Sequence, residues 1–182
     1  MRSAPGSSYQ WILIPDLAWA ELAALEAARD KRAAKAPNTR YWRPNPNLPG
    51  LAGEWGYGAI SDQLMNMTPE IWHDQLGQDF PGVDVKATTN KGNPHLNHGD
   101  EQELKSPLYF GALVDLDEHM VKPLGYATRA MLQAAPRHRY RHGEVGRIHP
   151  AELLTADMLL SRLLAGLTVD ELAEINPMPE AA

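Results

Sequence analysis

The chain contains no cysteine, which excludes disulfide bridges and cysteine-ligated zinc sites. It also lacks any apolar run close to the roughly 20 residues that a membrane-spanning helix needs, and its polar start is unlike a secretion signal. Positive charge is scarce, since 17 Lys and Arg stand against 23 Asp and Glu, a net charge of −6. We therefore expect an intracellular protein without membrane contact, either cytoplasmic or phage-encoded within a bacterial host.

The acidic balance works against tight non-specific binding of nucleic acids, because that affinity comes mainly from Lys and Arg neutralising phosphates. The net negative charge is weaker evidence against catalysis on nucleic acids. A nuclease site is itself a group of carboxylates that a divalent metal ion neutralises. The positions of the basic residues are therefore more informative than the total charge.

The length of 182 residues and a hydrophobic content of 43% favour one domain, covering residues 1–182, with 1–10 flexible and 176–182 as a tail. Helical patterns come first, strand patterns follow, and helical patterns return. This order is typical of an α/β (α+β) fold with a central mixed sheet flanked by helices. The expected helices are 16–35, 51–67, a short one at 68–70, 128–135, 150–167 and 168–175; the expected strands are 83–88, 108–114, 119–126 and 144–149, and a proline-rich loop spans 36–50.

The segment Val83 to Thr88 alternates apolar and polar residues, as a half-buried strand does. Asp84 and Lys86 therefore share one face, about 6 to 7 Å apart along the strand. A carboxylate and a lysine so placed can have separate roles in a hydrolytic reaction. The carboxylate binds a metal ion, and the lysine positions or deprotonates the attacking water.

A Pro81-Gly82 pair precedes this strand and predicts a type II turn over residues 80–83. Such a turn makes Asp79 and Asp84 the next facing pair of an antiparallel hairpin, with Cβ atoms about 4.5 to 5.5 Å apart. Two carboxylates at that distance repel each other unless a cation lies between them. Ligation by oxygen alone favours Mg²⁺ or Mn²⁺, so the pair predicts a metal site.

A third carboxylate has to come from elsewhere in the fold, and Glu54 is the best candidate. It begins the glycine-rich second helix, where the backbone can approach a ligand closely. A second Glu-x-Lys, Glu103-Leu104-Lys105, could instead pair with Asp84 as the first acid. We favour Asp84-Val85-Lys86, because its flanks alternate as a strand should, whereas residues 100–105 are mostly polar.

Together, Gly53-Glu54, Asp79 and Asp84-Val85-Lys86 resemble the motif set of the PD-(D/E)XK restriction-endonuclease-like superfamily. The likeness covers roughly residues 11–154 and includes the end of a strand pair at Gly125–Arg129, followed by a short helix. It implies that Asp79, Asp84 and the Val85 carbonyl bind Mg²⁺, that Glu54 binds metal or takes a proton, and that Lys86 orients the nucleophilic water. The chain departs from the pattern in having Gln78 where a proline usually precedes the first Asp.

The densest basic run lies at residues 137–142 and has two interpretations. Arg137, Arg139 and Arg141 could contact a phosphate backbone while Tyr140 stacks on a base. The same run could be a solvated loop, and the sequence leaves both open.

The residues support a Mg²⁺-dependent nuclease, with DNA as the expected substrate. The alternative is a catalytically inactive nuclease-like fold that binds nucleic acid or protein. A homodimer stays open for either function.

Overall fold

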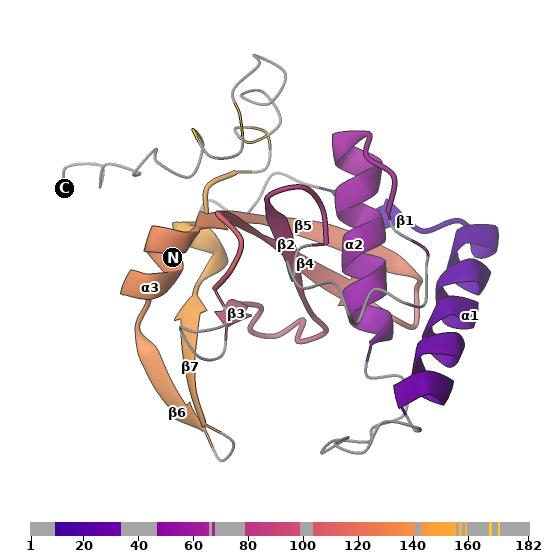
Figure 1. Cartoon of the computed structure of the whole chain (residues 1–182), viewed down its shortest axis with the longest axis horizontal. Helices are drawn as coiled ribbons and strands as arrows, with labels where there is room; N and C mark the ends of the chain where they lie inside the picture. The colour runs from indigo at the N-terminus through magenta and orange to yellow at the C-terminus, as the bar shows by residue number, and fades with distance from the viewer. Residues whose placement is uncertain are drawn as a thin grey trace.

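A computed structural model describes residues 10–33, 47–65, 67, 79–98, 104–140, 143–155, 157, 159, 168 and 171 (Figure 1). The helices are α1 (Asp16–Ala33), α2 (Leu48–Ser61), α3 (Arg129–Ala134) and a 3₁₀-helix at Pro150–Glu152. The strands are β1 (Ile12–Leu13), β2 (Val83–Thr88), β3 (Leu96–His98), β4 (Leu108–Asp115), β5 (Met120–Thr128), β6 (Arg137–Tyr140) and β7 (Gly143–Ile148). None of the helices in the described part is long and apolar enough to cross a membrane.

The larger sheet has the strand order β1-β5-β4-β2. Strand β2 runs parallel to β4, while the β4–β5 and β5–β1 pairs are antiparallel, so the sheet is mixed. Helix α2 lies against one face of it, and α1 packs beside α2 (Figure 1). The expected mixed sheet flanked by helices is confirmed, with β2 at an edge of the described sheet.

A second, antiparallel sheet with the order β3-β7-β6 was not expected, because the sequence indicated one central sheet. Strand β3 was not among the expected strands either. Its register pairs Leu96 with Ile148, and both side chains are buried in an apolar cluster between the two sheets. Tertiary pairing thus makes a strand from a segment that is too short and too polar to carry its own signal.

Helix α2 begins at Leu48, three residues before the expected start, and a buried acid on α1 explains why. Glu26 Oε1 accepts the backbone N–H groups of Asn47 (3.0 Å) and Leu48 (2.8 Å). A carboxylate at this end accepts hydrogen bonds from free N–H groups, and its negative charge interacts favourably with the positive end of the helix dipole. The helix ends at Ser61 rather than 67, because Asp62 adopts a left-handed conformation (φ 55°) that stops it.

Glycines let α2 lie directly on the sheet. A Cβ atom at Gly53 would lie 3.0 Å from the Cβ atom of Ala87 and 3.3 Å from Val85 Cγ1, so α2 and β2 are nearly in backbone contact. This close approach brings the next residue of the helix, Glu54, to the edge strand.

Gly56→Ala should destabilise the fold by about 1–3 kcal/mol, because overpacking a tight core costs that much. Its Cβ atom would lie 2.7 and 2.8 Å from the two γ-methyl carbons of Val121. Gly50→Ala, in the same helix with nothing within 4 Å, is the matched control and should be neutral or stabilising. Urea unfolding of both variants measures the difference, and equal stabilities would contradict the tight packing.

Candidate functional site

The turn before β2 forms as expected. Phe80 and Val83 exchange two backbone hydrogen bonds, of 3.0 Å from Phe80 N to Val83 O and 2.9 Å from Val83 N to Phe80 O. Gly82 has φ 74°, the left-handed value that a type II turn requires at its third residue. The turn reverses the chain between Asp79 and Asp84.

Asp79 and Asp84 meet at this turn, but not as a hairpin pair. At this turn, the antiparallel pairing among the described residues consists of the single Phe80–Val83 bridge. From Val83 onward, β2 pairs in parallel with β4. The hairpin interpretation was therefore wrong. Asp79 instead bends over the start of β2, where its Oδ2 atom accepts the N–H of Val85 at 2.7 Å and its carboxyl group hydrogen-bonds with that of Asp84.

Burial raises the pKa of Asp79 to about 7, and the charge of Asp84 and the hydrogen bond between the two carboxyl groups raise it further against the lowering effect of the Val85 N–H. Two carboxylates in contact cannot both ionise cheaply, so the neighbouring acid disfavours ionisation of Asp79. A divalent cation between them would relieve this repulsion.

Lys86 completes the contact. Its Nζ atom lies 2.7 Å from Asp84 Oδ2, and the two side chains share a face of β2, as the alternation predicted. Asp84 is buried, at 7% exposed, whereas the Lys86 side chain is 40% exposed. The lysine thus connects the buried acid to solvent.

Glu54 lies within electrostatic range of this group. Burial raises its pKa to about 8, the charge of Asp79 raises it next, and Arg29 and Lys86 lower it. Alternation places Asp84 and Lys86 on the face of β2 opposite the one that packs under Gly53. The coupling of Glu54 to the acids that the structure shows is therefore one between charges.

Within the described residues, no three His, Cys, Asp or Glu side chains are placed to hold one metal ion together. The structure brings Asp79, Asp84 and Lys86 into contact and places Glu54 nearby. The donor set of the three acids is all oxygen, which suits Mg²⁺ or Mn²⁺ in kind. For Val85, the structure shows one role, the N–H that orients Asp79.

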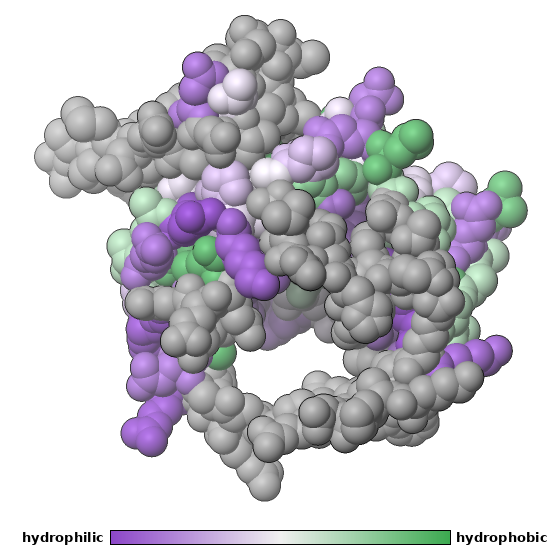
Figure 2. Space-filling view, in the orientation of Figure 1, coloured by the Kyte–Doolittle hydropathy of each residue, from purple (hydrophilic) through white to green (hydrophobic). Residues whose placement is uncertain are grey.

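The first part of the basic run forms a strand and not a loop, although Arg139 is exposed to solvent. Residues Arg137–Tyr140 make up β6, paired antiparallel with β7, and Arg137 and Arg139 share one face of the hairpin. Hydrophilic colour follows this hairpin on the left of Figure 2. Arg141 and the side chain of Tyr140 lie outside the described residues, as does Glu103 of the alternative Glu-x-Lys.

Two charged residues that the sequence interpretation missed, Glu26 and Arg29, lie buried on α1, at 3% and 4% exposed. The sequence contains a signal for their burial, which is their spacing along the helix. Together with Leu22 and Leu25 they occupy the i, i+3, i+4, i+7 positions of the helix face that packs on the core. Charged residues at core spacing are rare without a partner or a function.

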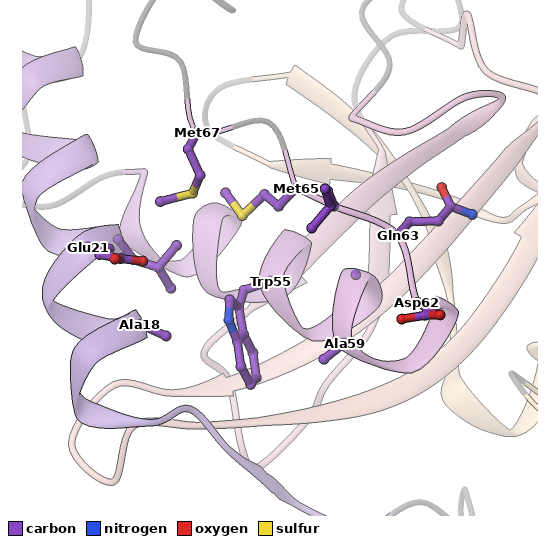
Figure 3. Close-up of a pocket in the computed structure, with 11 residues that line it drawn as sticks. Ala18, Glu21, Trp55, Ala59, Asp62, Gln63, Met65 and Met67 are labelled. Atoms are coloured by element: carbon purple, nitrogen blue, oxygen red, sulfur yellow. The ribbon is translucent and has the colours of Figure 1, made fainter.

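A groove of about 390 Å³ lies between α1 and the end of α2 (Figure 3). Trp55, Met65 and Met67 line it, with Glu21 and Asp62 at its sides. None of the candidate acids and neither Lys86 nor Arg29 belongs to the groove. It is a separate, mainly apolar feature.

Comparison with known proteins gives no relationship on which to build: no family model matches, nor does any curated protein or solved structure.

Proposed function

We propose that the chain is a metal-dependent nuclease that hydrolyses phosphodiester bonds, with DNA as the expected substrate and a restriction-endonuclease-like fold. One observation carries the proposal, the contact between Asp79 and Asp84 with Lys86 bound to the buried acid. Paired carboxylates beside a lysine, at the edge of a mixed sheet, match the needs of metal-assisted hydrolysis. The resemblance of the motifs to the PD-(D/E)XK superfamily supports the same chemistry.

Asp79 and Asp84 would hold the metal ion, Mg²⁺ or Mn²⁺, and Glu54, on which both of their charges act, is the expected source of a further oxygen donor. Once bound, such an ion polarises a phosphoryl oxygen and lowers the pKa of its water.

The other steps belong to the chain itself. The Val85 N–H fixes the orientation of Asp79, so this carboxylate needs no large rearrangement to act. Lys86 has three N–H donors and a half-exposed side chain, which lets it hold a water or a phosphate oxygen above Asp84. Arg137 and Arg139 on the β6–β7 hairpin are suited to contact the phosphate backbone of the substrate.

The direct test is cleavage of supercoiled plasmid, single-stranded DNA and a matched RNA by purified protein in Mg²⁺, Mn²⁺ or EDTA. We expect cleavage of DNA that depends on the metal ion. Absence of metal-dependent cleavage of all three substrates would overturn the proposal.

Lys86→Ala is expected to lower the rate of cleavage by about 10²- to 10⁴-fold, the usual contribution of a positioned proton-transfer group. Lys91→Met is the matched control, since Lys91 also pairs with a buried aspartate, Asp115, away from the site. The control should cleave within about twofold of the parent protein. Single-turnover rates measure both. Equal losses of rate in the two variants would show that losing any buried Asp–Lys pair is enough to slow cleavage, and would contradict a specific role of Lys86.

A second candidate is an inactive nuclease-like module that binds nucleic acid, and the basic strand β6, in which Arg139 is exposed, favours it. Fluorescence anisotropy with labelled DNA in EDTA separates the two functions. Binding that is lost in Arg137→Ala/Arg139→Ala, in a protein without cleavage, would support this module over the nuclease.

A further inference from the structure

The guanidinium group of Arg29 is buried in α1, and two of its nitrogen atoms, Nε and Nη2, have no hydrogen-bond partner in the described structure. The acids on the adjoining turn are otherwise engaged. Glu26 accepts the N–H groups at the start of α2, and Asp30 Oδ1 lies 3.5 Å from the side-chain nitrogen of Asn47. Arg29 is thus a buried cation whose Nε and Nη2 atoms have no hydrogen-bond partner in the described chain.

Leaving such donors unpaired costs stability. An unsatisfied buried polar group costs about 1–3 kcal/mol, and a charged one costs more. Buried polar groups without a partner in a native fold call for a specific explanation, such as a missing ligand or a role in a site. A methionine or leucine would pack at this position without that cost.

The two unpaired atoms are not a random pair. Nε–H and Nη2–H lie on the same edge of the guanidinium plane and point in parallel, forming the fork that binds two oxygens of one anion. Shielding from water strengthens that contact. The fork therefore fits a carboxylate or a phosphate, and two oxygen atoms of one anion are needed to satisfy both of its N–H groups.

Arg29 also lies near the candidate site, since its charge acts on Glu54. Glu54 nevertheless makes no hydrogen bond to the fork. The site is rich in carboxylates, and among the described residues only two cations act on Glu54, namely Lys86, which pairs with Asp84, and Arg29, whose fork has no partner. We propose that Arg29 binds a phosphate group of the substrate through its Nε and Nη2 atoms.

This binding role rests on the proposed nuclease function, but a metal-free measurement can test it separately. The probe is inorganic phosphate, titrated in EDTA by equilibrium dialysis. The parent protein should bind it, and Arg29→Lys, which keeps the charge and loses the fork, should bind it about tenfold more weakly, with Arg29→Met weaker still. Lys31→Met, an exposed cation on the same helix, is the control and should bind within about twofold of the parent.

Thermal unfolding in phosphate-free buffer distinguishes binding from a structural role. Arg29→Met should be as stable as the parent or more so, because it removes an unpaired buried charge. Equal phosphate binding by the parent and Arg29→Lys would overturn the proposal. So would a loss of stability in Arg29→Met with phosphate binding intact.

The nuclease proposal and the anion-site proposal can fail independently, and each failure gives a different result. Phosphate binding that depends on Arg29, in a protein that cleaves nothing, would overturn the nuclease and leave the anion site in place. Metal-dependent cleavage with a KM that does not change in Arg29→Lys would overturn the anion site and leave the nuclease. If the nuclease and the anion site both hold, Arg29→Lys should raise KM with kcat within about twofold.

Discussion

Asp84→Asn should reduce metal-dependent cleavage by at least about 10³-fold, since a ligated cation contributes several kcal/mol to the transition state. Asp84 is the one acid that contacts both other members of the group, Asp79 through a side-chain hydrogen bond and Lys86 through a 2.7 Å ion pair. Asparagine keeps the shape and one oxygen but removes the charge. The change therefore tests the chemistry more than the packing.

Asp115→Asn is the matched control for this variant. Asp115 is a buried aspartate, at 6% exposed, that forms an ion pair with Lys91 and accepts backbone N–H groups from Asp117 and Glu118. Its loss should leave cleavage within about twofold of the parent. Single-turnover cleavage in Mg²⁺ and Mn²⁺ measures both variants, with circular dichroism to confirm folding. Cleavage that survives in Asp84→Asn would remove this residue from the site.

The local part of the site could be predicted from the sequence. A Pro-Gly turn and a strict alternation act over a few residues, and both signals were correct: residues 80–83 turn, and Asp84 and Lys86 share a face. The parallel partner of β2 is different, because it depends on β4, more than twenty residues further along the chain. For that reason the turn was predicted and the hairpin was wrong.

The non-local part of the site depends on packing that no short pattern encodes. Glu54 reaches the edge strand because glycines let α2 lie on the sheet, and the tight contact at Gly53 is visible only once β2 and β4 are in place. Arg29 and Glu26 reach the core through the helical period of α1. That period was readable, but their charges argued against burial.

The carboxylates of the site also make a prediction about stability. The pKa of Glu54 is raised from 4.5 to about 8 and that of Asp79 from 3.8 to about 7, chiefly by burial in both cases. An acid whose pKa is higher in the folded state binds more protons there than in the unfolded chain. It therefore stabilises the fold at acidic pH, and that stability is lost as the pH rises through the folded pKa.

The metal-free protein should accordingly lose a few kcal/mol of stability between about pH 4 and pH 8, since each pKa unit corresponds to about 1.4 kcal/mol. Glu54→Gln combined with Asp79→Asn should flatten this dependence and make the protein more stable than the parent at pH 8. Asparagine at 79 retains an oxygen to accept the Val85 N–H, so the turn is preserved. Urea unfolding from pH 4 to pH 9 in EDTA measures the dependence for both proteins.

Adding Mg²⁺ or Mn²⁺ should reverse the loss, and should do so more strongly at pH 8 than at pH 5, because a cation binds the ionised carboxylates and competes with the protons. The double variant should gain little from either ion. Asp115→Asn again serves as control, since the pKa of Asp115 is lowered, chiefly by its hydrogen bond with Lys91. That variant should retain the full response to the ions at pH 8. A metal response that is equal in the parent and the double variant would place any bound ion elsewhere in the chain and separate these buried acids from metal binding.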